Sequence, residues 1–513
     1  MRTFAAWLCA LALISGCDRP PSSDSQPPAA TRTAADAPNI LWVVWDTVRA
    51  DHMSLHGHAR PTTPNLDEWA KTARVYDDCI SPSSITICSH ASMFTGLSTS
   101  EHGANNARIF LEDQFETIAE ILARAGYRTY CYSANANVSR DLNLTQGFEL
   151  VEHPWSPKYI ERAIEIVRKK TEGDDSSELG GKLRQLAPNK QDVKASGELA
   201  VPAVEDWLKA TDSRTPYFVF VNWMEAHRQL IPPRRLRERF MTPAQVEKSF
   251  KVDRSWTSTW EYTLGVREMS DEDIELTRLT YDAALLELDE LFDLLLTRLR
   301  AAGALENTIV IVTSDHGEHL GEHHMLDHQF SVYDVLLRVP LIVHYPAKFA
   351  PGRESRPVMT HDLFPTLLEI IGLPAQAKTA SAISLLHPAE ARDRLAGYPT
   401  PFTEGLSLVK RRNKDFDFKP WNRGLRAFQS GEFKLIAGTD KRDELYNLKL
   451  DPGELQNLIA GQPEIAKRLH EQLEAHLRLL TPFKSTGQRI PTISPDVQMQ
   501  RNFGGYTGED DTE

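Results

Sequence analysis

Cysteine is scarce in this chain of 513 residues, which contains only five. Cys9 and Cys17 lie near the N-terminus, so only Cys79, Cys88 and Cys131 remain in the body of the protein. An odd number of cysteines in an oxidising compartment allows at most one pair and one free thiol. A small disulfide scaffold is therefore excluded, and whether two of the three are paired stays open.

Positive charge is also in deficit, because 58 Lys and Arg residues stand against 71 Asp and Glu residues, a formal net charge of -13. Affinity for a phosphate backbone is built from clustered cations, so no nucleic-acid partner is expected. Hydrophobic residues make up 41% and charged residues 25% of the chain. These shares are near those of soluble globular chains and exclude wholesale disorder, collagen and polytopic membrane proteins.

The apolar run near the N-terminus is too short to cross a bilayer as a stable helix. It covers residues 4–14 behind Arg2 and predicts a secretory signal peptide over residues 1–16. The segment Ile14-Ser-Gly-Cys17 resembles a bacterial lipobox, in which Cys17 carries the lipid; the alternative is an ordinary signal peptide with an incidental cysteine. Residues 17–37, rich in Pro, Ser, Ala and Thr, are typical of a flexible tether. We expect an extracytoplasmic lipoprotein, membrane-anchored at the periplasmic or cell surface.

Strands and helices alternate in the body, which predicts an α/β sandwich. Residues 39–45 and 308–314 are near-continuous apolar runs, each followed by an acid, Asp46 or Asp315. Buried strands that end in a polar residue place ligand sites at the carboxyl edge of open α/β sheets. Further strands are expected at 127–132 and 217–223, and helices at 115–125 and 271–301.

The domain boundaries follow from changes in this pattern. One α/β domain is expected over residues 38–374, with a polar surface insertion at about 156–196 that lies near the substrate mouth or is solvated padding. Short strands over 425–438 and 444–448 and an amphipathic helix over 463–480 predict a smaller C-terminal α+β subdomain over 375–480. Residues 481–513, rich in Pro, Gly and Asp, are predicted to be a tail.

Seven motifs in order along the chain resemble the sulfatase family of the alkaline phosphatase superfamily. They are Asp46-Thr-Val-Arg-Ala-Asp51, Thr62-Thr-Pro-Asn-Leu-Asp67, Ser89-His-Ala-Ser-Met-Phe-Thr-Gly96, Thr313-Ser-Asp-His-Gly-Glu318, Arg338-Val-Pro-Leu-Ile342, Phe364-Pro-Thr-Leu-Leu368, and Glu444-Leu-Tyr-Asn-Leu448 with Asp451-Pro-Gly-Glu454. The resemblance implies an α/β sandwich with a large central mixed sheet and a smaller C-terminal α+β subdomain. It also implies a hydrolase that acts on sulfuric or phosphoric esters.

The chain departs from the family at the residue that carries the chemistry. Family sulfatases oxidise a Cys or Ser to formylglycine at a set distance before a Thr-Gly turn, and from Thr95-Gly96 that distance leads to Thr86. Threonine is not a substrate of that maturation, and the Pro and Arg that normally follow are absent, so no formylglycine is expected. The resemblance then implies Thr86 as nucleophile, whereas the plainer alternative is an ordinary turn residue.

The resemblance also implies one divalent metal ion bound by Asp46, Thr86, Asp315 and His316. An acid, a Thr, an Asp and a His in this order resemble the Thr-dependent, phospho-transferring branch of the superfamily, which includes lipoteichoic acid synthases and phosphoethanolamine transferases. A His ligand favours manganese or zinc over calcium, although calcium stays possible. The alternative for Asp46 is the N-cap of a helix.

Three further residues are catalytic candidates by the same resemblance. His227 matches the family His that contacts the ester, His328 stands where many members have a Lys, and Arg49 would position the nucleophile segment or contact the anion. The alternatives are satisfied loop histidines and an ion pair of Arg49 with Asp51 or Asp67. By residue type alone, five further histidines could be metal ligands, but their crowding near the Asp-His motif is interpreted as a solvated rim: His90, His102, His319, His323 and His324. Added positive charge is expected from the segment that contains Arg228, Arg234, Arg235, Arg237 and Arg239.

We therefore predict a metal-dependent hydrolase that cleaves a sulfate or phosphate ester with metal-activated Thr86. The substrate would be a sulfated or phosphorylated sugar, lipid or aryl compound. Two alternatives stay open: a phospho-group transferase or phosphodiesterase of the same superfamily, and a binder of sulfated or phosphorylated glycans that does not turn them over. The retained metal set argues against the binder, and the missing Lys-x-x-His-type pair at residues 133–137 leaves the leaving-group acid undefined.

Overall fold

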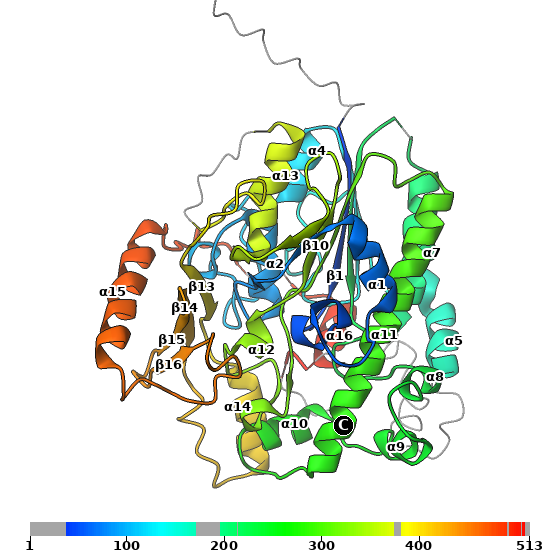
Figure 1. Ribbon diagram of the computed structural model, residues 1–513. Helices are drawn as coiled ribbons and strands as arrows, with labels where there is room; N and C mark the ends of the chain where they lie inside the picture. Colours follow the sequence, from blue (N-terminus) through cyan, green and yellow to red (C-terminus); the bar gives the residue numbers. More distant parts are fainter. Residues whose placement is uncertain are drawn as a thin grey trace, which may run out of the picture.

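The computed structural model describes residues 37–170, 195–212, 214–373, 381–489, 492–503 and 505–507. An eight-stranded sheet of order β11-β2-β10-β7-β1-β6-β4-β5 forms its centre (Figure 1). The strands are β1 (Asn39–Trp45), β2 (Arg74–Tyr76), β4 (Arg128–Ser133), β5 (Leu150–Glu152), β6 (Tyr217–Trp223), β7 (Thr308–Thr313), β10 (Leu341–His344) and β11 (Gly352–Glu354). The sheet is mixed, since β1 is parallel to β6 and β7 whereas β10 is antiparallel to β7.

Helices cover both faces of this sheet. Figure 1 shows α7 and α11 on one side and α2, α4 and α13 on the other. The helices are α1 (Pro64–Trp69), α2 (Thr86–Thr95), α3 (Thr99–His102), α4 (Ile118–Arg124), α5 (Ile160–Lys170), α7 (Ser196–Lys209), α8 (Arg234–Arg237), α9 (Pro243–Ser249), α10 (Trp256–Thr263), α11 (Asp271–Ala301), α12 (Asp334–Leu337) and α13 (Leu363–Ile371).

The double cover explains why β1 is apolar at almost every position. Ile40, Trp42 and Val44 belong to the hydrophobic cluster that includes α2 and α13, whereas the alternate residues 41, 43 and 45 belong to the cluster that includes α7 and α11. Successive side chains of a strand point to opposite faces, so a strand buried on both faces has no polar alternation. The predicted strands at 39–45 and 217–223 and the helix at 271–301 are confirmed with the same bounds.

A smaller unit follows the main sheet. Its antiparallel sheet contains β13 (Arg394–Tyr398), β14 (Leu425–Ser430), β15 (Phe433–Gly438) and β16 (Glu444–Asn447), and it carries the amphipathic helix α15 (Pro463–Leu479). Leu469 and Leu473 of α15 pack on Leu435 and Leu445 of this sheet. Helix α14 (Thr403–Arg412) and the two-stranded pairs β3 (Cys79–Ile80) with β12 (Val358–Met359) and β8 (His319–Leu320) with β9 (Leu326–Asp327) complete the elements before α16. The predicted α+β subdomain is present.

The segment predicted to be a tail contains structure that the sequence did not reveal. Helix α16 (Pro495–Phe503) lies in it, and Val497 packs with Ala134, Ala136, Trp155 and Met224. In Figure 1, α16 is drawn in red near the lower end of β1, away from the small sheet β13–β16. The C-terminal segment therefore returns to the carboxyl edge of the main sheet.

Other predictions meet the structure only in part. Of the predicted insertion, residues 160–170 form α5, which buries Ala163, Ile166 and Val167 in the core, so this part is not solvated padding. Residues 171–194 lie outside the described residues, as do the predicted signal peptide, Cys17 and nearly all of the predicted tether. The thiols of Cys79, Cys88 and Cys131 are buried and unpaired with one another. Among the described helices, none has the length and apolar character needed to span a membrane.

Candidate active site

Two acids meet at the carboxyl edge of the sheet because their strands are in register. Val44 of β1 pairs with Thr313 of β7. Asp46 lies two residues after Val44, and Asp315 lies two residues after Thr313. Thr47 then adopts a left-handed backbone with φ of 61°, which is uncommon for a β-branched residue. This conformation lets the Thr47 N–H donate to Oδ1 of Asp315 at 3.2 Å. Backbone strain of this kind is concentrated at functional sites.

Thr86 reaches the same edge at the first residue of α2. The helix ends at Gly96, whose φ of 70° suits glycine and whose N–H donates to the Ser92 carbonyl. A Cβ at Gly96 would lie 2.7 Å from the ring of Phe364, so the Thr-Gly turn also permits close packing on α13. The positive end of the helix dipole surrounds Thr86, which favours a bound anion there.

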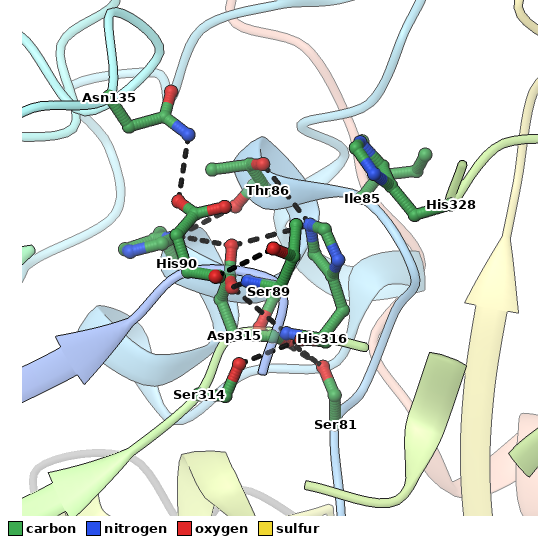
Figure 2. Close-up of polar contacts among 12 residues, drawn as sticks. Ser81, Ile85, Thr86, Ser89, His90, Asn135, Ser314, Asp315, His316 and His328 are labelled. Carbon is green, nitrogen blue, oxygen red and sulfur yellow. Dashed lines mark hydrogen bonds and ion pairs between the residues drawn. The ribbon is translucent and has the colours of Figure 1, made fainter. Parts of the chain in front are cut away.

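The hydroxyl of Thr86 faces His316. Their Oγ1 and Nε2 atoms are 3.2 Å apart, while Nδ1 of His316 lies 3.0 Å from the Gly317 carbonyl. A ring nitrogen that faces a carbonyl must carry the proton, so the other nitrogen, Nε2, accepts from Thr86. Figure 2 shows Thr86 at the start of α2 facing Asp315 and His316, which follow β7.

The carboxylates of Asp46 and Asp315 are fully buried and each keeps one oxygen without a partner. Oδ2 of Asp46 accepts from Asn135 at 2.8 Å and from Asn222 at 3.1 Å, but its Oδ1 and Oδ2 of Asp315 have none. Burial raises the pKa of each carboxyl to about 7, and Asp315 also raises that of Asp46. Burial lowers the pKa of His316 to about 3.

Asp46, Asp315 and His316 offer ligand atoms that all lie within 4.8 Å of one another. Two carboxylate oxygens and one unprotonated imidazole nitrogen form a set of metal ligands that suits a divalent cation. The orphaned oxygens and the absence of hydrogen-bond donors for them show that these residues fit such an ion. The predicted set is thus brought together, with the Thr86 hydroxyl beside it.

His90, which the sequence analysis assigned to a solvated rim, instead lies in the site. It lies one helical turn after Thr86, is fully buried, and its Nδ1 donates to the Thr86 carbonyl at 3.0 Å. Its spacing of four residues on a helix was the available signal. The predicted solvated rim is also wrong for His102 and His319, since both are buried and bonded to serine hydroxyls.

His328 provides a positive charge next to the site. Its Nδ1 lies 2.9 Å from Asp327 and 3.3 Å from Glu318, and its ring centroid is 4.5 Å from that of His316. Although burial opposes the charge, the carboxylates of Asp327 and Glu318 hold the pKa of His328 well above its usual range. Asp327 is held in turn by Trp260 and Arg228. Figure 2 shows His328 beside His316.

His227 lies beside His328, with ring centroids 5.4 Å apart, and its ring is fully buried. Its Nδ1 donates to the Arg228 carbonyl at 2.7 Å, which leaves Nε2 as an acceptor; Nε2 lies 3.1 Å from the hydroxyl of Tyr506. Asn222 was missed although it interrupts an apolar strand, and Tyr506 had no local signal.

Arg49 does not contact the site in the predicted way. Its guanidinium forms ion pairs with Asp51 at 2.8 Å and with Glu322 at 2.9 Å, and it also donates to the Glu318 carbonyl. The structure thus places Arg49 in the ion pair with Asp51 that was its alternative. Gly317 packs on this region so closely that a Cβ would lie 2.0 Å from the Val335 carbonyl.

The predicted basic segment does not supply a basic pocket either. Arg234 and Arg235 pair with Glu247 and Glu290, and Arg237 is buried against backbone carbonyls. Arg228 is the exception, because it is buried beside His227, stacks on Trp256 and contacts Asp327. The positive charge nearest the site therefore comes from His328 and Arg228.

Comparisons with known proteins agree with this geometry. Residues 38–373 match the family model described as Sulfatase. The chain is 26% identical to N-acetylglucosamine-6-O-sulfatase of Bacteroides thetaiotaomicron, over 85% of each chain. It is 24% identical to arylsulfatase K of Bos taurus, over 91% of this chain and 87% of that protein. The fold is similar to that of phosphonate monoester hydrolase of Agrobacterium radiobacter, with a TM-score of 0.68, 20% identity, and 86% and 96% of the two chains covered.

Proposed function

This chain belongs to the sulfatase family and is a hydrolase of sulfuric or phosphoric esters, and from that premise we propose that its nucleophile is the hydroxyl of Thr86. One observation carries the proposal. Thr86 begins α2 with its Oγ1 at 3.2 Å from Nε2 of His316, beside two buried carboxylates that each keep an unpartnered oxygen. A threonine hydroxyl is a weak nucleophile unless its surroundings activate it.

We assign the metal-binding role to Asp46, Asp315, His316 and Thr86. When bound there, a divalent cation would lower the pKa of the Thr86 hydroxyl and offset the two carboxylate charges. The imidazole ligand favours manganese or zinc over calcium, which prefers all-oxygen sites. Asn135 and Asn222 both donate to Oδ2 of Asp46 and so orient its Oδ1 toward the cluster.

The residues around Thr86 define a covalent route. The Thr86 hydroxyl releases its proton as Oγ1 forms a bond to the sulfur or phosphorus atom, and the bond from that atom to the alcohol oxygen breaks. The departing oxygen takes up a proton from water and leaves as the alcohol. Water then hydrolyses the ester on Thr86 and restores the hydroxyl. The imidazolium of His328, held by Asp327 and Glu318, stabilises the negative charge that gathers on the other oxygens. Nε2 of His316 lies 3.2 Å from Thr86 Oγ1, so the two atoms would face the same ion when one is bound.

The substrate class follows from the charge of the site and from the relatives. An anionic ester fits a pocket bordered by a helix N-terminus and an imidazolium. The relative from Bacteroides thetaiotaomicron is named for sulfate removal from N-acetylglucosamine, which supports a sulfated sugar as the first substrate to test. Phosphorylated sugars and sulfated or phosphorylated lipids and aryl compounds share the chemistry.

A substrate panel tests this function directly. The purified chain should be assayed with N-acetylglucosamine 6-sulfate and with nitrophenyl esters of sulfate, phosphate, phosphonate and diesterified phosphate. Each assay is repeated with manganese, zinc, calcium or a chelator. We expect turnover of at least one ester, highest with manganese or zinc and lost with the chelator. Binding of the sulfated sugar without turnover of any ester under any metal would instead identify a non-catalytic binder.

We also propose that the enzyme acts outside the cytoplasm, anchored by lipid on Cys17. Replacing Cys17 by serine should release the protein from the membrane fraction with unchanged activity, because the tether precedes the first strand of the fold, which begins at Asn39. Incorporation of a fatty-acid probe measures the lipid. Cys9→Ser, which changes the other N-terminal cysteine, is the matched control and should still be labelled. Labelling of the Cys17→Ser variant would refute the anchor.

A further inference from the structure

The C-terminal segment places a phenol inside the candidate active site. The hydroxyl of Tyr506 lies 3.1 Å from Nε2 of His227 and accepts a hydrogen bond of 2.8 Å from Nδ2 of Asn135. The second hydrogen of the same Asn135 amide goes to Oδ2 of Asp46. Because Nδ1 of His227 carries the ring proton, Nε2 is unprotonated and accepts a hydrogen bond from the Tyr506 hydroxyl. Tyr506 thus links Asp46, through Asn135, to His227.

This position is supported by contacts that Ser494, Val497 and Arg501 make upstream of Tyr506. Ser494 binds Asp141 through its N–H and its hydroxyl, and Nε of Arg501 donates to Oδ1 of Asn137 at 3.1 Å. Val497 fills an apolar cluster under α16. Asn137 and Asp141 follow β4, so the helix is attached to the same loop that holds Asn135. The segment therefore approaches the site as an anchored part of the fold.

Gly505 allows the backbone to bring the Tyr506 phenol into the site. Its φ of 77° is in the left-handed region, and a Cβ there would lie 2.3 Å from the ring of Trp256. Trp256 also stacks under Arg228, 3.7 Å from the guanidinium to the ring centroid. A side chain at position 505 would thus push the Tyr506 backbone away from the pocket.

Cleavage of an ester leaves negative charge on the departing alcohol oxygen, and a donor must face it. The loop after β4, Ser133-Ala-Asn-Ala-Asn137, offers only neutral side chains, and its Asn135 already uses both amide hydrogens on Asp46 and Tyr506. Nε2 of His227 carries no proton in this tautomer, so it cannot donate a hydrogen bond to a ligand. Among these neighbours, the Tyr506 hydroxyl is the group with a proton that can turn toward a ligand.

We propose that Tyr506 is a catalytic residue whose hydroxyl donates a hydrogen bond to the leaving-group oxygen of the ester. The inference rests on the proposed function and identifies the hydrogen-bond donor for the alcohol oxygen of the ester. In the free enzyme the phenol proton is held by His227, and it turns to the ester oxygen as the bond to sulfur or phosphorus breaks. Asn135 keeps the phenol oxygen in place by donating to it.

The dependence of rate on the leaving group tests this role. In Tyr506→Phe the ring stays and the hydroxyl is lost, so kcat/KM for an ester of an alkyl alcohol should fall about 100-fold. For the 4-nitrophenyl ester it should change little, because nitrophenolate is stable without a donor. The matched control is Tyr345→Phe, which removes a phenol that bonds Asn307 at the other end of the sheet and should leave both rates unchanged.

A second variant probes the geometry without touching the phenol. Gly505→Ala should displace Tyr506 and reproduce the selective loss on the alkyl ester, with the nitrophenyl rate retained. An equal fall for both esters in Tyr506→Phe would show a packing role only, and a rise for both would show that the phenol blocks the site; either result overturns the proposal. The nitrophenyl activity should be lost in Thr86→Ala but kept in Tyr506→Phe. This difference tests the nucleophile role of Thr86 separately from the donor role of Tyr506.

Discussion

Replacing Thr86 by alanine should reduce turnover by about 10⁴-fold or more while the protein stays folded, because the change removes the proposed nucleophile. The hydroxyl contacts Nε2 of His316 at 3.2 Å and the phenol of Tyr506, both within the site, so its loss leaves the hydrophobic core intact. Thr86→Ser keeps the oxygen and loses only the methyl group that positions it. We therefore expect partial activity from the serine variant, measured as kcat with circular dichroism as the check on folding.

The covalent step gives this experiment a second readout. Mass spectrometry of the resting wild type should show Thr86 unmodified, and rapid quenching with substrate should show a sulfate or phosphate adduct on the peptide that contains it. Thr95→Ala is the matched control, since Thr95 ends the same helix and its hydroxyl bonds the Ala91 carbonyl. Wild-type turnover by Thr86→Ala would mean that water attacks directly, and the covalent mechanism would be abandoned.

Asp315→Asn or His316→Ala should lower metal occupancy and activity together, with affinity for the ion reduced by at least about 100-fold. Each variant removes a ligand atom from a cluster whose members lie within 4.8 Å. Elemental analysis of protein purified without chelator measures the occupancy. In metal-free protein, Asp315→Asn should not lower the free energy of unfolding, because it removes one of two neighbouring buried carboxylates whose like charges oppose each other.

The structure supplies a control for this experiment in a second group of ligand-type residues. His52, His58 and Asp282 also lie close together, but Arg60 donates to Oδ2 of Asp282 at 2.6 Å and already provides the positive charge. Asp282→Asn should therefore leave metal occupancy unchanged. Full occupancy and normal turnover in both Asp315→Asn and His316→Ala would remove these residues from the proposed metal site.

The sequence alone determined those features that depend on local pattern. The apolar runs at 39–45 and 217–223 predicted strands with the observed bounds, because strands covered on both faces admit almost no polar residue. The same rule placed Asp46 and Asp315 at one edge of the sheet, since parallel strands in register end together. The resemblance to family sulfatases singled out Thr86 by its distance from Thr95-Gly96, and helix α2 spans that distance.

Tertiary structure decided how each side chain is used, because a charge takes whichever partner folding brings nearest. Arg49 was equally consistent with an ester contact and an ion pair, and the fold places Asp51 and Glu322 against it. His90 was interpreted from the sequence as part of a solvated rim, but in the folded protein it lies on α2 and is fully buried. Tyr506 lies in a segment rich in Pro, Gly and Asp, and its partners Asn135 and His227 are 371 and 279 residues away in the chain. No local pattern encodes such a contact, since it arises only when α16 packs on the loop after β4.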